Sequence, residues 1–147
     1  MKKFFSVVVI GSVLLVSVAA TAQAQLPGTA IRATIPFDFK VQGRTLPAGN
    51  YEIRRINDDE SIGLFIRNVD DKHDKAMFGT EPVYMNRIPG KNVLVFNRYG
   101  DAYFLSEVET ASDQTARELF PSRKERHLQQ QMAKNLVAPE TVTVACN

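Results

Sequence analysis

The stretch Ile31-Arg32-Ala33-Thr34-Ile35-Pro36-Phe37-Asp38-Phe39-Lys40-Val41 decides the fold class, because apolar and polar side chains alternate along its whole length. A period of two places the apolar side chains on one face of a β-strand and the polar side chains on the other. Pro36 lacks the N–H that a sheet ladder needs, so we expect this strand to lie at a sheet edge or to carry a bulge. The stretch therefore predicts a β-rich domain.

Shorter strands are predicted downstream, each bounded by a turn or a charged loop. Leu46-Pro47-Ala48-Gly49 suits a type I turn, which leads into a strand opening at Tyr51. A charged loop from Asn57 to Ser61 ends that strand, and further strands are predicted over 62–69 and near 76–85.

The clearest hairpin is predicted over residues 93–109, with Gly100-Asp101 at its turn. Glycine at the first central position suits a type II′ turn, which sets Arg98 opposite Tyr103. Both faces of this hairpin are apolar. We therefore expect the core of the sheet to cover one face and another element to cover the other.

A helix is the candidate for that cover. Ser122 followed by Glu125 is a capping box, which predicts a helix running to about Lys134. Residues 141–146 alternate again and predict a closing strand.

Together these elements predict a mainly β fold, an antiparallel meander of six or seven strands with one C-terminal helix. Pairing of the first strand with the last would close a small barrel and remove the free edges. A two-sheet sandwich has the same sequence pattern. Both architectures, beta-barrel and beta-sandwich, stay open at this point.

Residues 1–24 have the three parts of a secretory signal peptide. Lys2 and Lys3 precede an apolar run, and Ala22-Gln23-Ala24 matches the A-x-A cleavage rule. The alternative is a retained membrane anchor, but the run is a little short for a span of about 20 residues. We expect export to the periplasm or the medium, a single β-rich domain over 25–147, and no stable membrane anchor after cleavage.

The charge balance changes when the signal peptide is removed. All 16 acidic residues and 16 of the 18 Lys and Arg residues follow it, so the mature domain is formally neutral. Nucleic-acid binding depends on neutralising phosphates with basic side chains. We therefore do not expect nucleic acid as a partner.

Cys146 is the single cysteine of the chain, so no internal disulfide can form. Two interpretations of Cys146 remain. It can join two chains in a disulfide-linked dimer, or it can be a buried small apolar side chain.

A ligand or partner patch is predicted at the hairpin tip, formed by Arg98, Tyr99, Asp101 and Tyr103. Exposed aromatic rings beside arginine can stack on sugars or on a protein partner. The alternative is that Tyr103 packs against the opposed Arg98 as a cross-strand pair.

The histidines do not belong to a recognised metal motif. His73 lies in a run of charged residues, 70–75, that fails the calcium-loop pattern because Lys72 stands where an acidic ligand is needed. His127 has no second histidine at helical spacing. We expect no metal, no cofactor and no catalytic residue of a known motif.

Glu107 and Glu109 lie on one side of a predicted strand, about 7 Å apart. This separation overlaps the carboxylate spacings of glycosidases. Neighbours on one strand seldom flank a scissile bond, however, and the alternative is ion pairing with arginine.

The turn and core motifs of the chain lie in Ala33–Phe39, Thr45–Glu52 and Arg98–Leu105, with a Ser-Arg-x-Glu helix start at Ser122. These motifs resemble a family of small exported uncharacterised bacterial β-rich proteins, over most of residues 30–130. The resemblance implies export and a β-rich fold. It implies no assigned activity, so it assigns no functional residue.

Three hypotheses for function follow. The first is an exported non-enzymatic β-domain that binds a protein or an envelope component. The second is a small carrier that holds an apolar ligand inside a barrel, motivated by the alternating faces of Phe37, Phe39 and Phe96. The third is a carboxylate-based hydrolase that uses Glu107.

Overall fold

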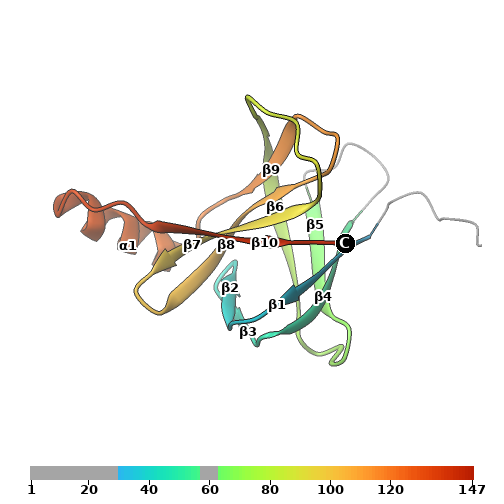
Figure 1. Ribbon diagram of the computed structural model, residues 1–147. Coiled ribbons are helices and arrows are strands. Elements are labelled where there is room, and N and C mark those ends of the chain that lie inside the picture. The colour runs from blue at the N-terminus through green and yellow to red at the C-terminus, as the bar shows by residue number, and fades with distance from the viewer. Residues whose placement is uncertain (1–29, 57–62) are drawn as a thin grey trace, which may run out of the picture.

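The computed structural model describes residues 30–56 and 63–147, so the expected signal peptide and the predicted charged loop from Asn57 to Ser61 lie outside the described residues. The described chain is mainly β with one helix near its C-terminus, as predicted (Figure 1). Its elements are β1 (Ile31–Ile35), β2 (Phe39–Val41), β3 (Arg44–Leu46), β4 (Gly49–Arg55), β5 (Gly63–Asn68), β6 (Lys75–Tyr84), β7 (Val93–Tyr99), β8 (Ala102–Glu109), β9 (Thr115–Leu119), α1 (Arg123–Lys134) and β10 (Glu140–Ala145).

The strands form an open mixed sheet, which matches the predicted antiparallel meander only roughly. The order is β1-β4-β5-β6-β9-β8-β2-β3, and β7 pairs with both β8 and β10. The pair β2–β8 is parallel, whereas the other pairs are antiparallel. The described residues contain ten strands instead of six or seven. The difference arises partly because the long first strand is divided.

Pro36 is the cause of that division. β1 ends at Ile35, directly before the proline, and β2 begins at Phe39. Because Pro36 has no N–H, the ladder between β1 and β4 cannot continue through it. The chain then bends, and β2 pairs with β3 and β8 instead of β4. β1 lies at one end of the strand order, which agrees with the edge position predicted from Pro36.

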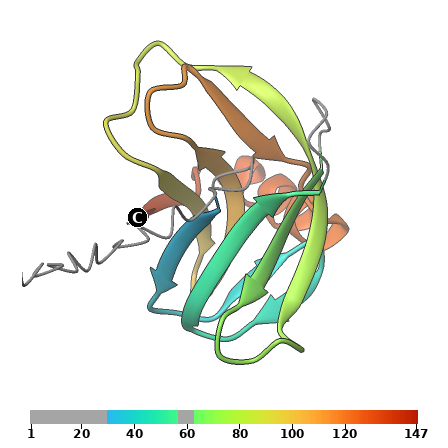
Figure 2. The same cartoon turned by 90° about the vertical axis from the view of Figure 1, so that its right-hand side faces the viewer.

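The predicted C-terminal strand is present as β10, but it pairs with β7 and not along β1. Arg32 of β1 and Asn147, just beyond β10, exchange two backbone hydrogen bonds of 3.1 and 2.9 Å. Figure 2 shows how far the sheet curls to bring its ends near each other. The strand pairing nevertheless leaves the sheet open.

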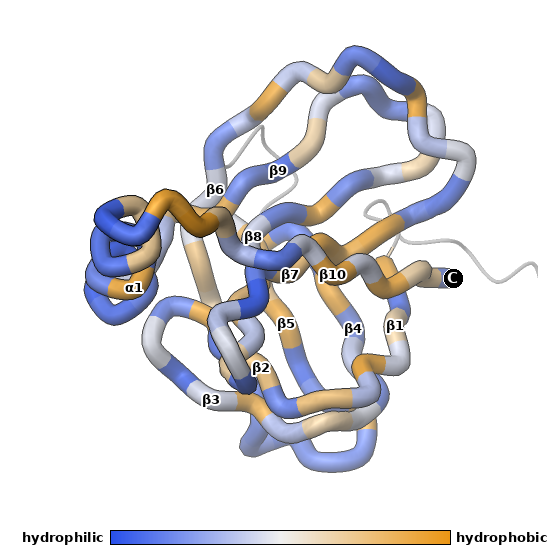
Figure 3. Tube along the Cα trace, turned by 60° about the vertical axis from the view of Figure 1, so that its left-hand side comes forward, coloured by the Kyte–Doolittle hydropathy of each residue, from blue (hydrophilic) through white to orange (hydrophobic). Residues whose placement is uncertain are grey.

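The curled sheet buries one apolar core. Large side chains at or below 2% exposure include Ile35, Phe39, Leu46, Tyr51, Ile53, Ile66, Leu94, Phe96 and Phe104. Figure 3 shows hydrophobic positions alternating with polar ones along the strands, as a one-sided core requires. Burying a side chain of this size stabilises the fold by about 1.5–3 kcal/mol.

The hairpin of β7 and β8 has the predicted register next to its turn. Arg98 faces Tyr103, and Gly100 has a φ of +62°, as the first central residue of a type II′ turn requires. A bulge then leaves Ser106 without an opposed residue. Because one extra residue reverses the alternation, the bulge places Val108 on the same core face as Leu105.

Helix α1 begins at the predicted capping box and contacts this hairpin near its first turn, where Asn97 and Tyr99 of β7 meet Glu125. The Ser122 hydroxyl accepts a hydrogen bond of 3.2 Å from the backbone N–H of Glu125. Glu125 is the buried residue of the helix, so α1 attaches through its first turn and then projects from the sheet (Figure 1). No helix in the part of the chain that the structure describes is long and apolar enough to cross a membrane.

Candidate functional site

The outer face of β1, β4, β5 and β6 carries a row of charged side chains in register. Arg32, Glu52, Arg67 and Lys75 are opposed in turn across these four strands. Arg54 lies two residues after Glu52 and therefore projects from the same face. Figure 2 shows the four strands side by side. We call these five residues the arginine face.

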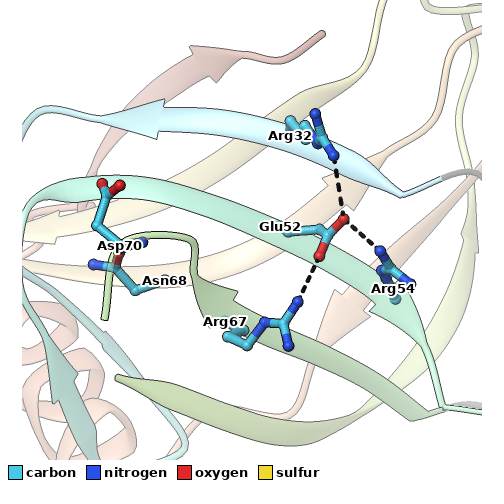
Figure 4. Close-up of polar contacts among 6 residues, drawn as sticks. All are labelled: Arg32, Glu52, Arg54, Arg67, Asn68 and Asp70. Carbon is cyan, nitrogen blue, oxygen red and sulfur yellow. Dashed lines mark hydrogen bonds and ion pairs between the residues drawn. The ribbon is translucent and has the colours of Figure 1, made fainter. Parts of the chain in front are cut away.

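Glu52 lies at the centre of the arginine face and is only 5% exposed. Its Oε1 atom is 2.6 Å from Nη2 of Arg54 and 3.8 Å from Nη2 of Arg32. Its Oε2 atom is 3.1 Å from Nη2 of Arg67 (Figure 4). Three guanidinium groups from three adjacent strands thus converge on one carboxylate.

These contacts keep Glu52 ionised. The hydrogen bond from Arg54 is the main reason that the pKa of Glu52 lies below its ordinary value. Burial acts in the opposite direction, and Arg67 adds a second hydrogen bond that lowers the pKa further. A carboxylate that accepts charge-assisted hydrogen bonds is favoured in its charged form.

The arginines remain accessible although they contact Glu52. The side chains of Arg32, Arg54 and Arg67 are 74%, 50% and 39% exposed. Each guanidinium has five N–H donors, of which one carboxylate occupies only a few. Together with exposed Lys75, which is opposed to Arg67, the face carries four cations and one anion. Such an arrangement can bind a carboxylate, phosphate or sulfate group.

The loop after β5 borders the arginine face and is held by side-chain hydrogen bonds. Asn68 Oδ1 accepts the backbone N–H groups of Asp70 and Asp71 at 2.9 and 3.2 Å. The Asp70 carboxylate receives a hydrogen bond of 3.3 Å from the Asn50 amide. These contacts fix the direction in which β6 returns, which sets Lys75 opposite Arg67.

The structure divides the patch predicted at the hairpin tip. Tyr99 is 7% exposed, and its hydroxyl is 3.5 Å from the Glu125 carboxylate beneath α1. Arg98 instead lies over the Tyr103 ring, with its guanidinium carbon 5.4 Å from the ring centroid. The cross-strand packing expected as the alternative is therefore present, and Tyr99 does not share a surface with the other members.

Asp101 and Tyr103 line a shallow pocket of about 220 Å³, together with Asp38, Phe39, Lys40, Thr45 and Ala102. The Phe37 ring stacks on Tyr103 at a centroid distance of 3.9 Å. Because Phe37 and Arg98 both lie over the Tyr103 ring, its faces are poorly placed to stack on a sugar. The pocket is therefore poorly suited to the stacking of a ligand on Tyr103 that the sequence predicted.

The two glutamates of β8 have different surroundings. Glu109 is 4% exposed, and Arg87 Nη2 approaches both of its carboxylate oxygens, at 2.5 and 2.7 Å. Burial raises the pKa of Glu107, and repulsion from Glu109 and Glu118 adds to the effect. Glu107 and Glu109 also lie within hydrogen-bonding reach of each other, which is too close to flank a glycosidic bond. The geometry favours the ion-pair interpretation.

The histidines lie on the surface. His73 is exposed in the loop between β5 and β6, and His127 is exposed on α1 with its Nε2 atom 3.1 Å from Gln131 Nε2. Within residues 30–56 and 63–147, no group of three or more His, Cys, Asp and Glu side chains is placed to hold a metal ion.

Cys146 is buried, at 6% exposure, and burial raises the pKa of its thiol to about 11. Its Sγ atom donates a weak hydrogen bond of 3.5 Å to the Val144 carbonyl. A thiol in this state reacts slowly with another sulfur because little thiolate is present at neutral pH. The disulfide-linked dimer stays a prediction, and it would require Cys146 to leave the core.

No family model, curated protein or solved structure matches this chain, so its geometry alone supports the interpretation of the site. Sequence reasoning missed the arginine face. Arg32, Glu52, Arg54 and Arg67 all occupy the polar positions of alternating strands, and that pattern was the available signal. The pattern does not show that β1, β4 and β5 are neighbours, or which of their residues are opposed.

Proposed function

We propose that this protein is an exported, non-enzymatic binding domain that recognises an anionic group of a protein or an envelope component through the arginine face. The observation that carries the proposal is the convergence of Arg32, Arg54 and Arg67 on Glu52, with all three side chains still exposed. The signal peptide expected at residues 1–24 supports export.

Glu52 supports this function by orienting the arginines before a partner arrives. A free arginine side chain carries about 2 kcal/mol of rotamer entropy, part of which is lost on binding. Here two hydrogen bonds to Glu52 already restrict Arg54 and Arg67. The remaining N–H donors can therefore bind an anion at a lower entropic cost.

The apolar-carrier hypothesis receives less support. Of its motivating residues, Phe96 contacts both others edge-on, with ring centroids 5.2 Å apart for Phe37–Phe96 and 5.6 Å apart for Phe39–Phe96. Phe39 and Phe96 are both almost fully buried. Their faces are occupied by the core, which leaves them poorly placed to hold a ligand.

The proposal is tested by measuring the affinity of the purified protein for polyglutamate, polyphosphate and anionic lipid vesicles at low salt. We expect binding to at least one probe, weakened by Arg54→Gln and by Arg67→Gln and weakened further by added salt. Arg44→Gln is the control, because Arg44 is exposed on β3, away from the face. Equal weakening by all three substitutions, or no binding to any probe, would contradict the proposal.

A further inference from the structure

Apolar side chains continue the arginine face along the same side of the sheet. Arg54 is opposed to Phe65 of β5, and Phe65 is opposed to Met77 of β6. Met77 is 62% exposed, and Phe65 is half-buried. Because these two residues lie two positions from Arg67 and Lys75 on their strands, they project from the same face. The cations of the arginine face therefore border directly on apolar groups.

Two opposed glycines extend this apolar surface. Gly63 of β5 faces Gly79 of β6, so neither strand carries a side chain at this level. The Ile56 side chain lies over Gly63, with its Cδ1 atom 2.8 Å from the position that a Cβ atom would take there. The Phe120 ring lies over Gly79 in the same way, at 3.5 Å. Ile56 is still 40% exposed and Phe120 is 45% exposed. We call the four apolar residues of this face the apolar strip: Ile56, Phe65, Met77 and Phe120.

The arginine face beside this strip has an excess of positive charge. Its four cations accompany a single carboxylate, that of Glu52, which leaves three positive charges in excess. Peripheral proteins bind anionic lipid by the same two features. Basic groups contact the headgroups, and exposed apolar side chains enter the boundary between headgroups and acyl chains. The outer face of β1, β4, β5 and β6 thus carries both features side by side.

We infer that the anionic group recognised by the arginine face belongs to a lipid surface, so that the protein binds an anionic membrane through the outer face of β1, β4, β5 and β6. This inference rests on the proposed function of the arginine face. In the bound state, the free N–H groups of Arg54 and Arg67 donate to headgroup phosphates. Met77 and Phe120 enter the lipid interface beside them.

The apolar strip favours a lipid surface over a soluble polyanion. A polyanion neutralises the arginines but offers no apolar environment to Met77 or Ile56, whereas a bilayer supplies both. The shape of the sheet favours a lipid surface over a protein. The sheet curls around its core, so its outer face is convex (Figure 2). A convex face meets a deformable bilayer without the matched shape that a protein interface needs.

Two glutamates limit the contact on the far side of the apolar strip. Glu81 of β6 is opposed to Glu118 of β9, and both are exposed. An anionic membrane repels these carboxylates while it attracts the arginines. The repulsion orients the protein, so that the arginine face and the neighbouring apolar strip meet the lipid and the glutamates stay at the border of the contact.

The test compares a lipid surface with a soluble polyanion at low salt. The two probes are vesicles of equal parts phosphatidylcholine and phosphatidylglycerol, and polyphosphate. The protein is its exported form, which begins after the predicted cleavage site, so that the signal peptide does not itself bind lipid. We expect Arg67→Gln to weaken binding to both probes about fivefold, the effect of one cation near an anionic surface. Met77→Thr should weaken binding to the vesicles by about the same factor and leave binding to polyphosphate unchanged. Threonine suits an exposed strand position, so this variant keeps the fold.

Ile88→Thr is the matched control, because Ile88 is also 62% exposed but lies between β6 and β7, outside the apolar strip. Its affinity for the vesicles should be unchanged. A second measurement uses fluorescence, since the chain contains no tryptophan. The emission of Met77→Trp should move to shorter wavelength with the vesicles and not with polyphosphate, because only the lipid interface takes up the ring. Ile88→Trp should show no such movement.

Equal affinities of Met77→Thr and Ile88→Thr for the vesicles, or an unchanged emission of Met77→Trp, would overturn the inference. If the protein binds polyphosphate or polyglutamate but not the vesicles, the proposed function survives, and the anionic group belongs to a soluble partner. If the protein binds none of these probes, both proposals fail.

Discussion

Glu52 of β4 and Arg67 of β5 are directly opposed across the strand pair, with Oε2 of Glu52 3.1 Å from Nη2 of Arg67. Opposed charges of this kind stabilise a sheet by about 0.2–1 kcal/mol. The pair also differs in exposure, since Glu52 is almost buried and Arg67 is 39% exposed. The carboxylate is therefore a structural centre, and the guanidinium can also contact solvent or a partner.

We expect Glu52→Gln to lower the free energy of unfolding by about 1–2 kcal/mol, because hydrogen bonds to a charged group are stronger than those to a neutral amide. The loss stays below the range for a fully buried pair, since the arginines left behind can be hydrated. Urea unfolding at pH 7 measures it. Glu118→Gln is the control and should not destabilise, because Glu118 faces other glutamates.

The same variant has a predicted pH dependence. The pKa of Glu52 is lowered in the folded protein. The stabilisation by its charge is therefore complete above the ordinary pKa of a glutamate, and it disappears as the pH falls through the pKa of Glu52 in the folded protein. The difference between the original protein and Glu52→Gln should thus shrink below about pH 4. If the difference in the free energy of unfolding between the two proteins stays constant down to pH 2, the charge of Glu52 does not contribute to stability.

Glu107→Gln should have the opposite effect and stabilise the protein at pH 7. Burial and the neighbouring glutamates raise the pKa of Glu107 in the folded protein. Its ionisation therefore lowers the free energy of unfolding once the pH rises above the ordinary pKa of a glutamate. The gain should vanish below about pH 4, where Glu107 is protonated in both folded and unfolded states. Thermal unfolding of both proteins at pH 4 and pH 7 checks the sign.

Arg87→Ala should lower the free energy of unfolding by about 3 kcal/mol, because it leaves the buried Glu109 carboxylate without its partner. Arg123→Ala on exposed α1 is the control and should change stability by less than about 0.5 kcal/mol. The double variant Arg87→Ala/Glu109→Gln should recover part of the loss, since no unpaired charge remains. Equal stability of the Arg87 and Arg123 variants would contradict this account of Glu109.

Tyr99→Ala should act on stability rather than on a surface patch. The Tyr99 ring is almost buried and meets Phe104 edge-on at a centroid distance of 5.5 Å. Removing a buried aromatic ring costs about 3–5 kcal/mol. Chemical unfolding measures the loss, and Asp101→Ala at the exposed turn should leave stability nearly unchanged.

Local patterns predicted the elements of this fold well. Alternation located the start of β1, the Gly100 turn set the hairpin register near its tip, and the capping box located the start of α1 at Ser122. Each of these features depends on residues close together in the chain. The bulge at Ser106 has no comparable signal, because a serine fits an ordinary strand position equally well.

The pairing of distant strands could not be predicted in this way. The parallel contact of β2 with β8 depends on where the chain goes after Pro36, and that is decided by packing. The candidate site depends on the same information. Arg32 and Arg67 meet Glu52 only because β4 lies between β1 and β5. The sequence shows that these residues face outward without showing that they share a row.

The most direct test removes the charges of the arginine face without leaving Glu52 unpaired. The variant Arg32→Gln/Glu52→Gln/Arg54→Gln/Arg67→Gln loses three cations and one anion, so its net charge falls by two. The control Arg44→Gln/Arg123→Gln has the same change in net charge at exposed positions elsewhere. The measurement is the affinity for polyglutamate at low salt. The account predicts at least a tenfold loss for the fourfold variant and little change for the control, whereas equal losses in the two proteins would contradict it.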